Sequence, residues 1–146
     1  MKKVGADVAV NYKTEDFVAA TKAATGGAGA NLIVDIVGGD YVDRNYDAAA
    51  EQGTIAQVSF TGGPKATANF ANLMRKRLTH TGSTLRPRTI AEKNAIVKGF
   101  EDKFWPLVAA GRIRPVIDSH FPMEQLAQAF AHQASNRHFG KICLDV

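Results

Sequence analysis

The sequence contains little cysteine and no long apolar run. Cys143 is the single cysteine among 146 residues, which excludes an internal disulfide and favours a reducing, cytoplasmic location. It lies in an apolar run typical of a strand, so we interpret it as a buried, unreactive thiol rather than a nucleophile. No window approaches the roughly 18 consecutive apolar residues that cross a bilayer. Residues 1–7 carry no apolar core of a signal peptide, so neither secretion nor membrane insertion is expected.

Several catalytic and binding signatures are also missing. The four histidines show no HExxH spacing and no cysteine partner, so a metal site is not expected, and His132 and His138 are expected on the surface. The Asp, Ser and His at 118–120 are consecutive on an extended segment and point to opposite faces, which excludes a catalytic triad. Neither GxGxxG nor GxxxxGK[ST] occurs. The glycine-rich stretch 26–29 precedes a strand, so we interpret it as a helix cap and turn.

The composition is that of an ordinary globular chain. Hydrophobic residues make up 45% and charged residues 22%, which excludes disorder and collagen-like structure. This length predicts one domain with a core of ordinary size, not separate cofactor and substrate domains. The net charge is +4. Residues 74–88 contain five basic residues and no acidic one, and we call these five the basic patch: Arg75, Lys76, Arg77, Arg86 and Arg88. The patch could meet nucleic acid or cofactor phosphates, or be a solvated helix end and loop.

The apolar pattern switches repeatedly between strand-like and helix-like segments. Strands are expected at 8–10, 31–37, 54–60 and 79–85, with helices at 14–26, 41–52 and 66–78. Thr14 is the expected N-cap of the first helix. The run 31–37 lacks polar alternation, which indicates a strand covered on both faces. Strands alternating with helices in this way predict an α/β fold with a parallel sheet.

Beyond residue 88 the pattern changes. A long helix is expected over 89–111, an edge strand over 113–118, a last helix from Pro122 and a terminal strand over 141–146. The change predicts a domain boundary near Gly111, which divides the chain into residues 1–112 and 113–146.

Two of the predicted strands end in glycine pairs, Gly38-Gly39 and Gly62-Gly63. In open α/β sheets, ligands bind beyond the carboxyl ends of the strands. Glycine there lets the backbone approach a flat ring or a carboxamide closely. The two pairs are therefore candidate ligand contacts, with ordinary turns as the alternative.

Five short motifs, taken in order, resemble the medium-chain dehydrogenase/reductase superfamily. They are Gly5-Ala6-Asp7 with Asn11-Tyr12, residues 35–39, Gly53-Thr54-Ile55 with Val58-Ser59-Phe60, residues 81–86, and residues 138–142. The last two are similar to its zinc-independent NAD(P)H:quinone oxidoreductase branch. The resemblance implies a partial Rossmann-like parallel sheet with helices on both faces over residues 1–112. It implies that the strand–helix–strand segment 113–146 packs with the catalytic domain of the family.

The activity implied by this resemblance is hydride transfer from a nicotinamide cofactor to a quinone or conjugated carbonyl. NADPH is the expected cofactor, with NADH as the alternative, and no catalytic side chain or metal is implied. Tyr12 would lie beside the adenosine ribose or its phosphate. The other residues that would contact the cofactor line the cofactor groove or its nicotinamide end: Val37, Gly38, Phe60, Thr61, Leu85 and Arg86. A homodimer through the edge strand 79–85 is also implied, whereas a membrane is not, and nucleic acid is not the expected partner.

The resemblance extends only to the C-terminal half of the family enzyme. The pyrophosphate-binding turn and most of the substrate domain are expected to precede residue 1, so the isolated chain is expected to bind NADPH weakly and to be weak or inactive as an enzyme. Two alternatives remain open. One is a small basic α/β module that binds nucleic acid through the basic patch, and the other is an assembly fragment without catalytic function.

Overall fold

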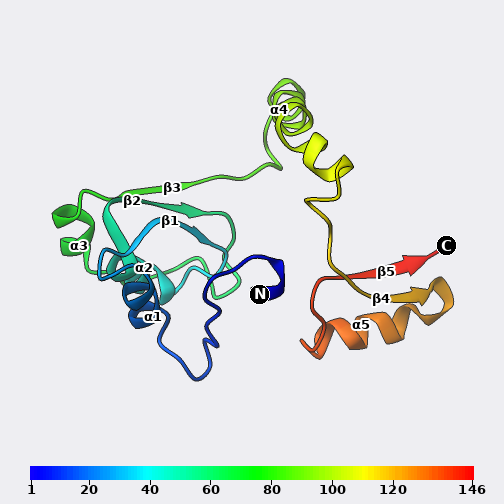
Figure 1. Ribbon diagram of the computed structural model, residues 1–146, viewed down its shortest axis with the longest axis horizontal. Coiled ribbons are helices and arrows are strands. Elements are labelled where there is room, and N and C mark those ends of the chain that lie inside the picture. The colour runs from blue at the N-terminus through cyan, green and yellow to red at the C-terminus, as the bar shows by residue number, and fades with distance from the viewer. The chain divides into compact units, whose positions relative to one another are not determined.

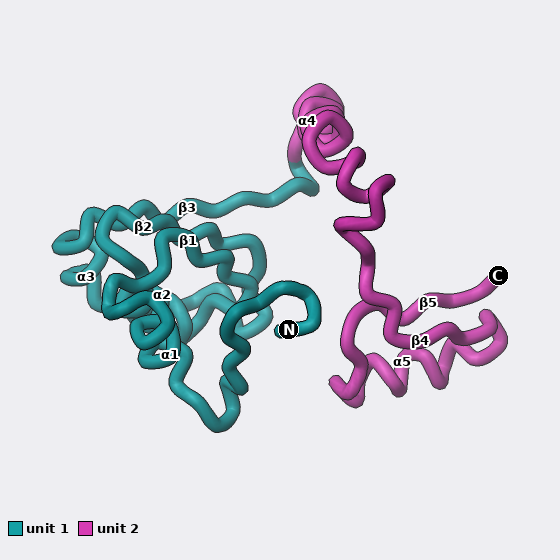
Figure 2. Tube along the Cα trace, viewed as in Figure 1, with its two compact units in different colours: residues 1–87 teal, residues 88–146 magenta.

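The computed structural model describes residues 1–146, which form two compact units, residues 1–87 and residues 88–146 (Figure 2). The units separate just after Pro87, where the loop that leaves the last strand of unit 1 ends and a newly capped helix begins. This division comes earlier than the boundary predicted near residue 112, because the long helix that follows belongs with unit 2. No helix of the chain combines the length and apolarity that crossing a bilayer requires.

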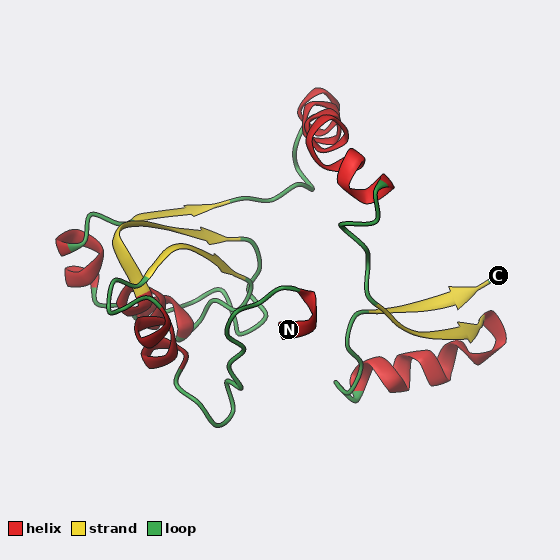
Figure 3. Ribbon diagram, viewed as in Figure 1, coloured by secondary structure: helices red, strands yellow, loops and turns green.

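Unit 1 contains a three-stranded parallel sheet in the order β1 (Ala30–Asp35), β2 (Ala49–Gln57), β3 (Thr79–Gly82) (Figures 1 and 3). In the register, Asp35 pairs with Gln57 and Gln57 pairs with Gly82. The predicted parallel α/β arrangement is therefore confirmed, and the carboxyl ends of all three strands lie at one edge of the sheet.

The strand predicted at residues 8–10 is wrong, because these residues pair with no strand and are irregular. The third predicted strand is also shifted: β2 begins at Ala49 and ends at Gln57, so residues 58–60 lie in the following loop. This shift matters for function, because it places Phe60 beyond the end of the sheet.

Three short helices connect the strands: α1 (Phe17–Ala24), α2 (Tyr41–Ala48) and α3 (Phe70–Arg75). The predicted N-cap of α1, Thr14, is wrong. Asp16 caps the helix instead, because its carboxylate accepts the backbone N–H of Val18 at 3.0 Å. The glycine-rich stretch ends α1 as predicted, with the N–H of Gly27 donating to the carbonyl of Lys22 at 2.7 Å.

The core of unit 1 is small and lies between the sheet and its helices. Tyr46, Ala49 and Ile55 are buried, and Ile33 and Leu73 pack against them. The side chains on the other face of β1 are exposed: Leu32 and Val34 are each 61% accessible. Burial in this chain therefore covers one face of β1, and the expectation of two covered faces is not met.

Lys76 closes the carboxyl end of α2. Its ammonium donates to the carbonyls of Tyr46 and Asp47 at 2.9 Å and of Ala49 at 2.8 Å. These carbonyls have no N–H partner from a further helical turn, so a cation satisfies them well. Burial lowers the pKa of Lys76 from its ordinary value, and the charge of Lys22 acts in the same direction.

Unit 2 begins with α4 (Ile90–Ala109), whose N-terminus has a capping box formed by Thr89 and Glu92. A two-stranded parallel sheet follows, made of β4 (Ile117–Pro122) and β5 (Lys141–Asp145). A 3₁₀ turn, η2 (Met123–Gln125), and α5 (Leu126–Ala134) connect the two strands. The strand predicted at 113–118 therefore starts later, and the terminal strand, which contains the partly buried Cys143, is confirmed.

Asp118 joins α5 to the start of β5. Its carboxylate accepts the backbone N–H of Phe139 at 2.8 Å and lies 2.8 Å from Nε2 of His132. His120 points elsewhere and contacts Asp145 at 3.0 Å, which agrees with the exclusion of a triad. The other two histidines are partly exposed rather than fully on the surface: the side chain of His132 is 29% exposed, and Nδ1 of His138 is enclosed without a hydrogen-bond partner.

Acid is expected to loosen this connection in unit 2. The hydrogen bond from Phe139 and then the contact with His132 lower the pKa of Asp118 to about 2. A folded-state pKa below the unfolded value of about 3.9 means that the stabilisation is present above about pH 4 and is lost as the pH falls toward 2. The protection factor of the Phe139 amide, which corrects for the intrinsic pH dependence of exchange, should fall across this window. In Asp118→Ala, which lacks the acceptor oxygen, the protection factor should be low at every pH, and equal protection factors in the two proteins would contradict the assignment.

Candidate functional site

Asp35 shapes the loop that leaves β1. Its side chain is 4% exposed, and one carboxylate oxygen accepts the backbone N–H of Val37 at 2.6 Å and of Gly38 at 3.0 Å. The other oxygen accepts an N–H of Asn45 from α2 at 2.9 Å. A buried carboxylate with three N–H donors is well satisfied. The turn after β1 is therefore held tightly between the strand and α2.

The loop after β2 is bonded to this turn. The carbonyl of Ile36 accepts the backbone N–H of Thr61 at 3.1 Å and the hydroxyl of the same residue at 3.0 Å. The carbonyl of Val37 accepts the N–H of Gly62 at 2.7 Å. The two loops thus form one layer beyond the sheet edge.

Gly38 lies where these loops approach most closely. Its φ of +66° is in the left-handed region that favours glycine. A Cβ at this position would lie 2.9 Å from the carbonyl oxygen of Gly63 and 3.0 Å from the ring of Phe60. Only glycine fits here without displacing the second loop.

An open groove of about 840 Å³ lies beyond the carboxyl ends of β2 and β3. We call it the strand-end groove. It is lined by residues 57–60 on one side and by residues 82–84, Arg86 and Pro87 on the other. Phe60 is 55% exposed at its wall, and a Cβ on Gly82 would meet only the carbonyl oxygen of Gln57, at 3.8 Å. The size falls within the range of small-molecule and cofactor sites.

The structure brings most of the predicted contacts together. Val37, Gly38, Phe60 and Thr61 belong to the two bonded loops, and Phe60 shares the strand-end groove with Arg86. Leu85 is exposed next to the groove but does not line it.

Tyr12 is the predicted contact that lies apart. It is 68% exposed in an irregular segment and does not line the strand-end groove. Its expected place beside the adenosine, and the cofactor roles of the other residues, stay predictions.

The residues that hold the groove together were not predicted from the sequence. Asp35 lies in the motif of residues 35–39 and Gln57 in the strand predicted at 54–60, but the local pattern gave neither residue a role. Both are polar residues at buried strand ends, with exposures of 4% and 8%. A polar residue that follows an apolar strand directly was the available signal, because burial at such a place requires hydrogen-bond partners.

The basic patch is largely engaged within the chain. Lys76 caps α2, Arg77 pairs with Glu51 at 2.5 Å, and Arg88 lies 3.7 Å from Glu92. These ion pairs lie at the surface and leave Arg77 58% exposed, so the nucleic-acid-binding module stays an alternative hypothesis.

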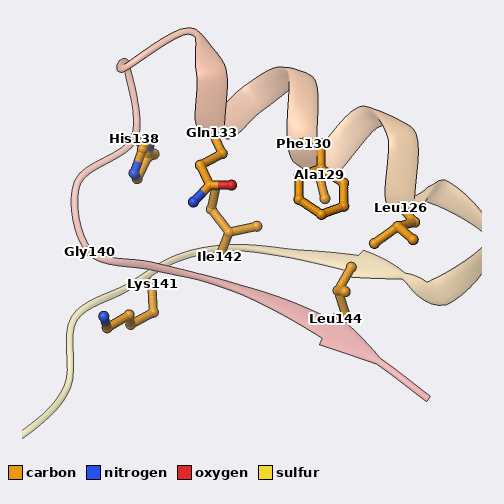
Figure 4. Close-up of a pocket in the computed structure, with 9 residues that line it drawn as sticks. All are labelled: Leu126, Ala129, Phe130, Gln133, His138, Gly140, Lys141, Ile142 and Leu144. Carbon is orange, nitrogen blue, oxygen red and sulfur yellow. The ribbon is translucent and has the colours of Figure 1, made fainter. Parts of the chain in front are cut away.

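A smaller cavity of about 260 Å³ lies in unit 2 between α5 and β5. Figure 4 shows His138 and Gln133 at one end and Leu126 and Leu144 at the other. None of the predicted cofactor contacts lines it. No group of three or more His, Cys, Asp or Glu side chains in this chain could hold a metal ion, so its residues do not by themselves fit a zinc centre.

A groove beyond the carboxyl ends of a parallel sheet is where open α/β proteins bind their ligands, and the sheet and groove place this chain in the α/β class. The model of the zinc-binding dehydrogenase family matches residues 4–144, and the chain belongs to this family. This match confirms the resemblance to the medium-chain dehydrogenases.

Curated relatives and solved structures agree with this assignment. A zinc-type alcohol dehydrogenase-like protein of Schizosaccharomyces pombe is 28% identical over 149 residues, covering 99% of this chain and 40% of the relative. The quinone oxidoreductase-like protein 2 of Bos taurus is 28% identical over 97% of this chain and 40% of its own length. An NAD-dependent alcohol dehydrogenase structure matches with 30% identity and a TM-score of 0.76, over 99% of this chain and 39% of that one. The chain therefore spans about two fifths of the length of these proteins.

Proposed function

We propose that this chain forms the nicotinamide side of the cofactor site of an oxidoreductase that transfers hydride from NADPH to a quinone or conjugated carbonyl. The observation that carries the proposal is the strand-end groove, with Phe60 and Arg86 on its two walls, in a chain of the dehydrogenase family. The quinone oxidoreductase-like relative supports this substrate class. NADH is the alternative cofactor.

The residues of the groove fit a nicotinamide group. Phe60 offers an exposed aromatic surface, and Gly82 leaves open space in front of β3. Ser83 and Thr84 add hydroxyls on the same wall, and Arg86 adds a positive charge suited to an anionic group. The cofactor, when bound, supplies the hydride, whereas the protein orients the ring and excludes water. The turn that would clamp the pyrophosphate has no counterpart in this sequence, so binding by the isolated chain is expected to be weak.

A titration of the chain with NADPH and with NADH tests this proposal. In NMR spectra, the backbone amides of Ser59, Gly82 and Ser83 should shift as either cofactor is added. Replacing Phe60 by alanine should weaken binding by about tenfold, since stacking on a ring contributes about 1–1.5 kcal/mol. The matched control is Phe70→Ala, an exposed aromatic outside the groove. Shifts confined to other regions, or equal effects of the two variants, would contradict the proposal.

We also propose a homodimer formed through β3. This strand lies at the edge of the sheet and pairs only with β2, so its outer side is available to a second strand. Thr81→Lys should shift the chain to a monomer in light-scattering measurements, because equal charges would face each other across the two-fold axis. A similar change at Thr25, beyond the end of α1, should leave the mass unchanged. A wild-type chain that is monomeric at all concentrations would overturn this assembly.

A further inference from the structure

Gln57 connects all three strand ends. It is the last residue of β2 and is 8% exposed. Its side-chain amide donates to the carbonyl of Asp35, at the end of β1, at 3.3 Å and to the carbonyl of Ser59 at 2.6 Å. Its backbone carbonyl accepts the N–H of Ser83, just beyond β3, at 3.1 Å. One buried residue is thus bonded to three separate segments.

These segments carry the walls of the strand-end groove. Ser59 precedes Phe60 on one wall, and Ser83 precedes Arg86 on the other. Asp35 holds the turn at Gly38, which supports the ring of Phe60 from behind. Loss of the side-chain amide would therefore change the position of the Phe60 wall relative to the Arg86 wall, which is held by the backbone bond from Ser83.

We propose that Gln57 is the positioning residue of the strand-end groove: its amide, bonded to the carbonyls of Asp35 and Ser59, holds the Phe60 wall at the end of β1, while its backbone carbonyl pairs with the Arg86 wall. The inference rests on the proposed function for the identity of the ligand. The Gln57 side chain thus controls how tightly the groove binds a flat nicotinamide ring, although the side chain need not touch the ring.

The amide is chemically required at this position. Both bonds need N–H donors on one nitrogen, because both partners are carbonyl oxygens. A glutamate of nearly equal shape has no donor when ionised and would face two carbonyl oxygens. Burial and these oxygens would raise the pKa of the introduced carboxyl. Once protonated, its O–H can donate to one of the two carbonyls. Methionine has similar size and no donor at any pH.

The experiment compares the wild-type chain with Gln57→Glu and Gln57→Met across a pH series. NADP⁺ serves as the probe because it withstands acid better than the reduced cofactor. Gln57→Glu should bind NADP⁺ roughly tenfold more weakly at neutral pH and should recover part of this loss as the pH falls. Gln57→Met should be weaker at every pH without recovery. The wild-type series at each pH corrects for pH effects that do not involve residue 57.

A second readout needs no ligand. Protection from hydrogen exchange at the amides of Thr61 and Gly62, which bond to the first loop, should follow the same pH pattern in Gln57→Glu. Protection of Ile55, in the middle of β2, should stay at the wild-type level in both variants. If wild type binds no NADP⁺, the proposed function fails, while the exchange pattern still tests the role of Gln57. Unchanged protection and affinity in both variants, or loss of Ile55 protection together with the groove, would overturn the inference.

Discussion

Replacing Gly38 by alanine is expected to lower the free energy of unfolding of unit 1 by about 3 kcal/mol and to abolish detectable cofactor binding. The added Cβ would lie 2.9 Å from the carbonyl of Gly63 and 3.0 Å from the ring of Phe60, at a backbone φ of +66°. Left-handed backbone in a non-glycine residue costs about 1–3 kcal/mol, and overpacking costs about as much again when the neighbours cannot move. Urea denaturation followed by circular dichroism, with the NADPH titration beside it, measures both effects.

Gly26→Ala separates backbone strain from the close contact. Gly26 has a φ of +60°, close to that of Gly38, and a Cβ there would meet nothing within 4 Å. Its substitution should cost only the backbone strain, about 1 kcal/mol, and should leave cofactor binding unchanged. Equal losses in the two variants would mean that the packing of the two loops does not matter for stability.

Replacing Lys76 by methionine is expected to destabilise unit 1 by about 3 kcal/mol. The ammonium satisfies the carbonyls of Tyr46, Asp47 and Ala49, and hydrogen bonds from a charged donor contribute about 1.5–3 kcal/mol each before the cost of burying the lysine is subtracted. Amide exchange at Ile55 should speed up accordingly. The fluorescence of Trp105, which lies in α4 of unit 2, should keep its wild-type unfolding transition.

The matched control is the neighbouring Arg77→Met. Arg77 also forms an ion pair, with Glu51, but their side chains are 58% and 64% exposed. Exposed pairs of this kind contribute about 0–1 kcal/mol. A loss as large as that of Lys76→Met would show that the basic patch acts through general electrostatics and not through the α2 cap.

Some strands agree with the sequence pattern and others do not. The apolar run of β1 and the terminal strand β5 were predicted closely, because apolar runs bounded by glycine depend mainly on local sequence. The segment 8–10 has the same strand-like composition, yet it pairs with no strand and forms none. Strand formation needs a partner, and a pattern alone does not tell whether one is present.

In the candidate site, too, some features were predicted from the sequence and others were not. The glycine pairs beyond β1 and β2 were candidate ligand contacts, with ordinary turns as the alternative; Gly38 lies where the two loops meet, and its ligand contact stays a prediction. Lys76, counted as one charge of a possible binding patch, is a helix cap. Gln57, which passed as an ordinary strand residue, joins three segments. Apart from Ser59, which Gln57 contacts locally, their partners are 20 or more residues away in the chain, so no local pattern reveals them.

Local residue types thus account for the class of this protein: alternating strands and helices, glycines at strand ends, and five motifs that mark a dehydrogenase lineage. Long-range contacts account for the rest, including which face of the sheet is buried, where β2 ends and which polar side chains hold the strand-end groove. The physical reason is that a polar or charged side chain takes its role from the groups that folding brings to it. For Lys76 and for the bond from Gln57 to Asp35, those groups are backbone carbonyls of distant segments, which only the folded chain brings together.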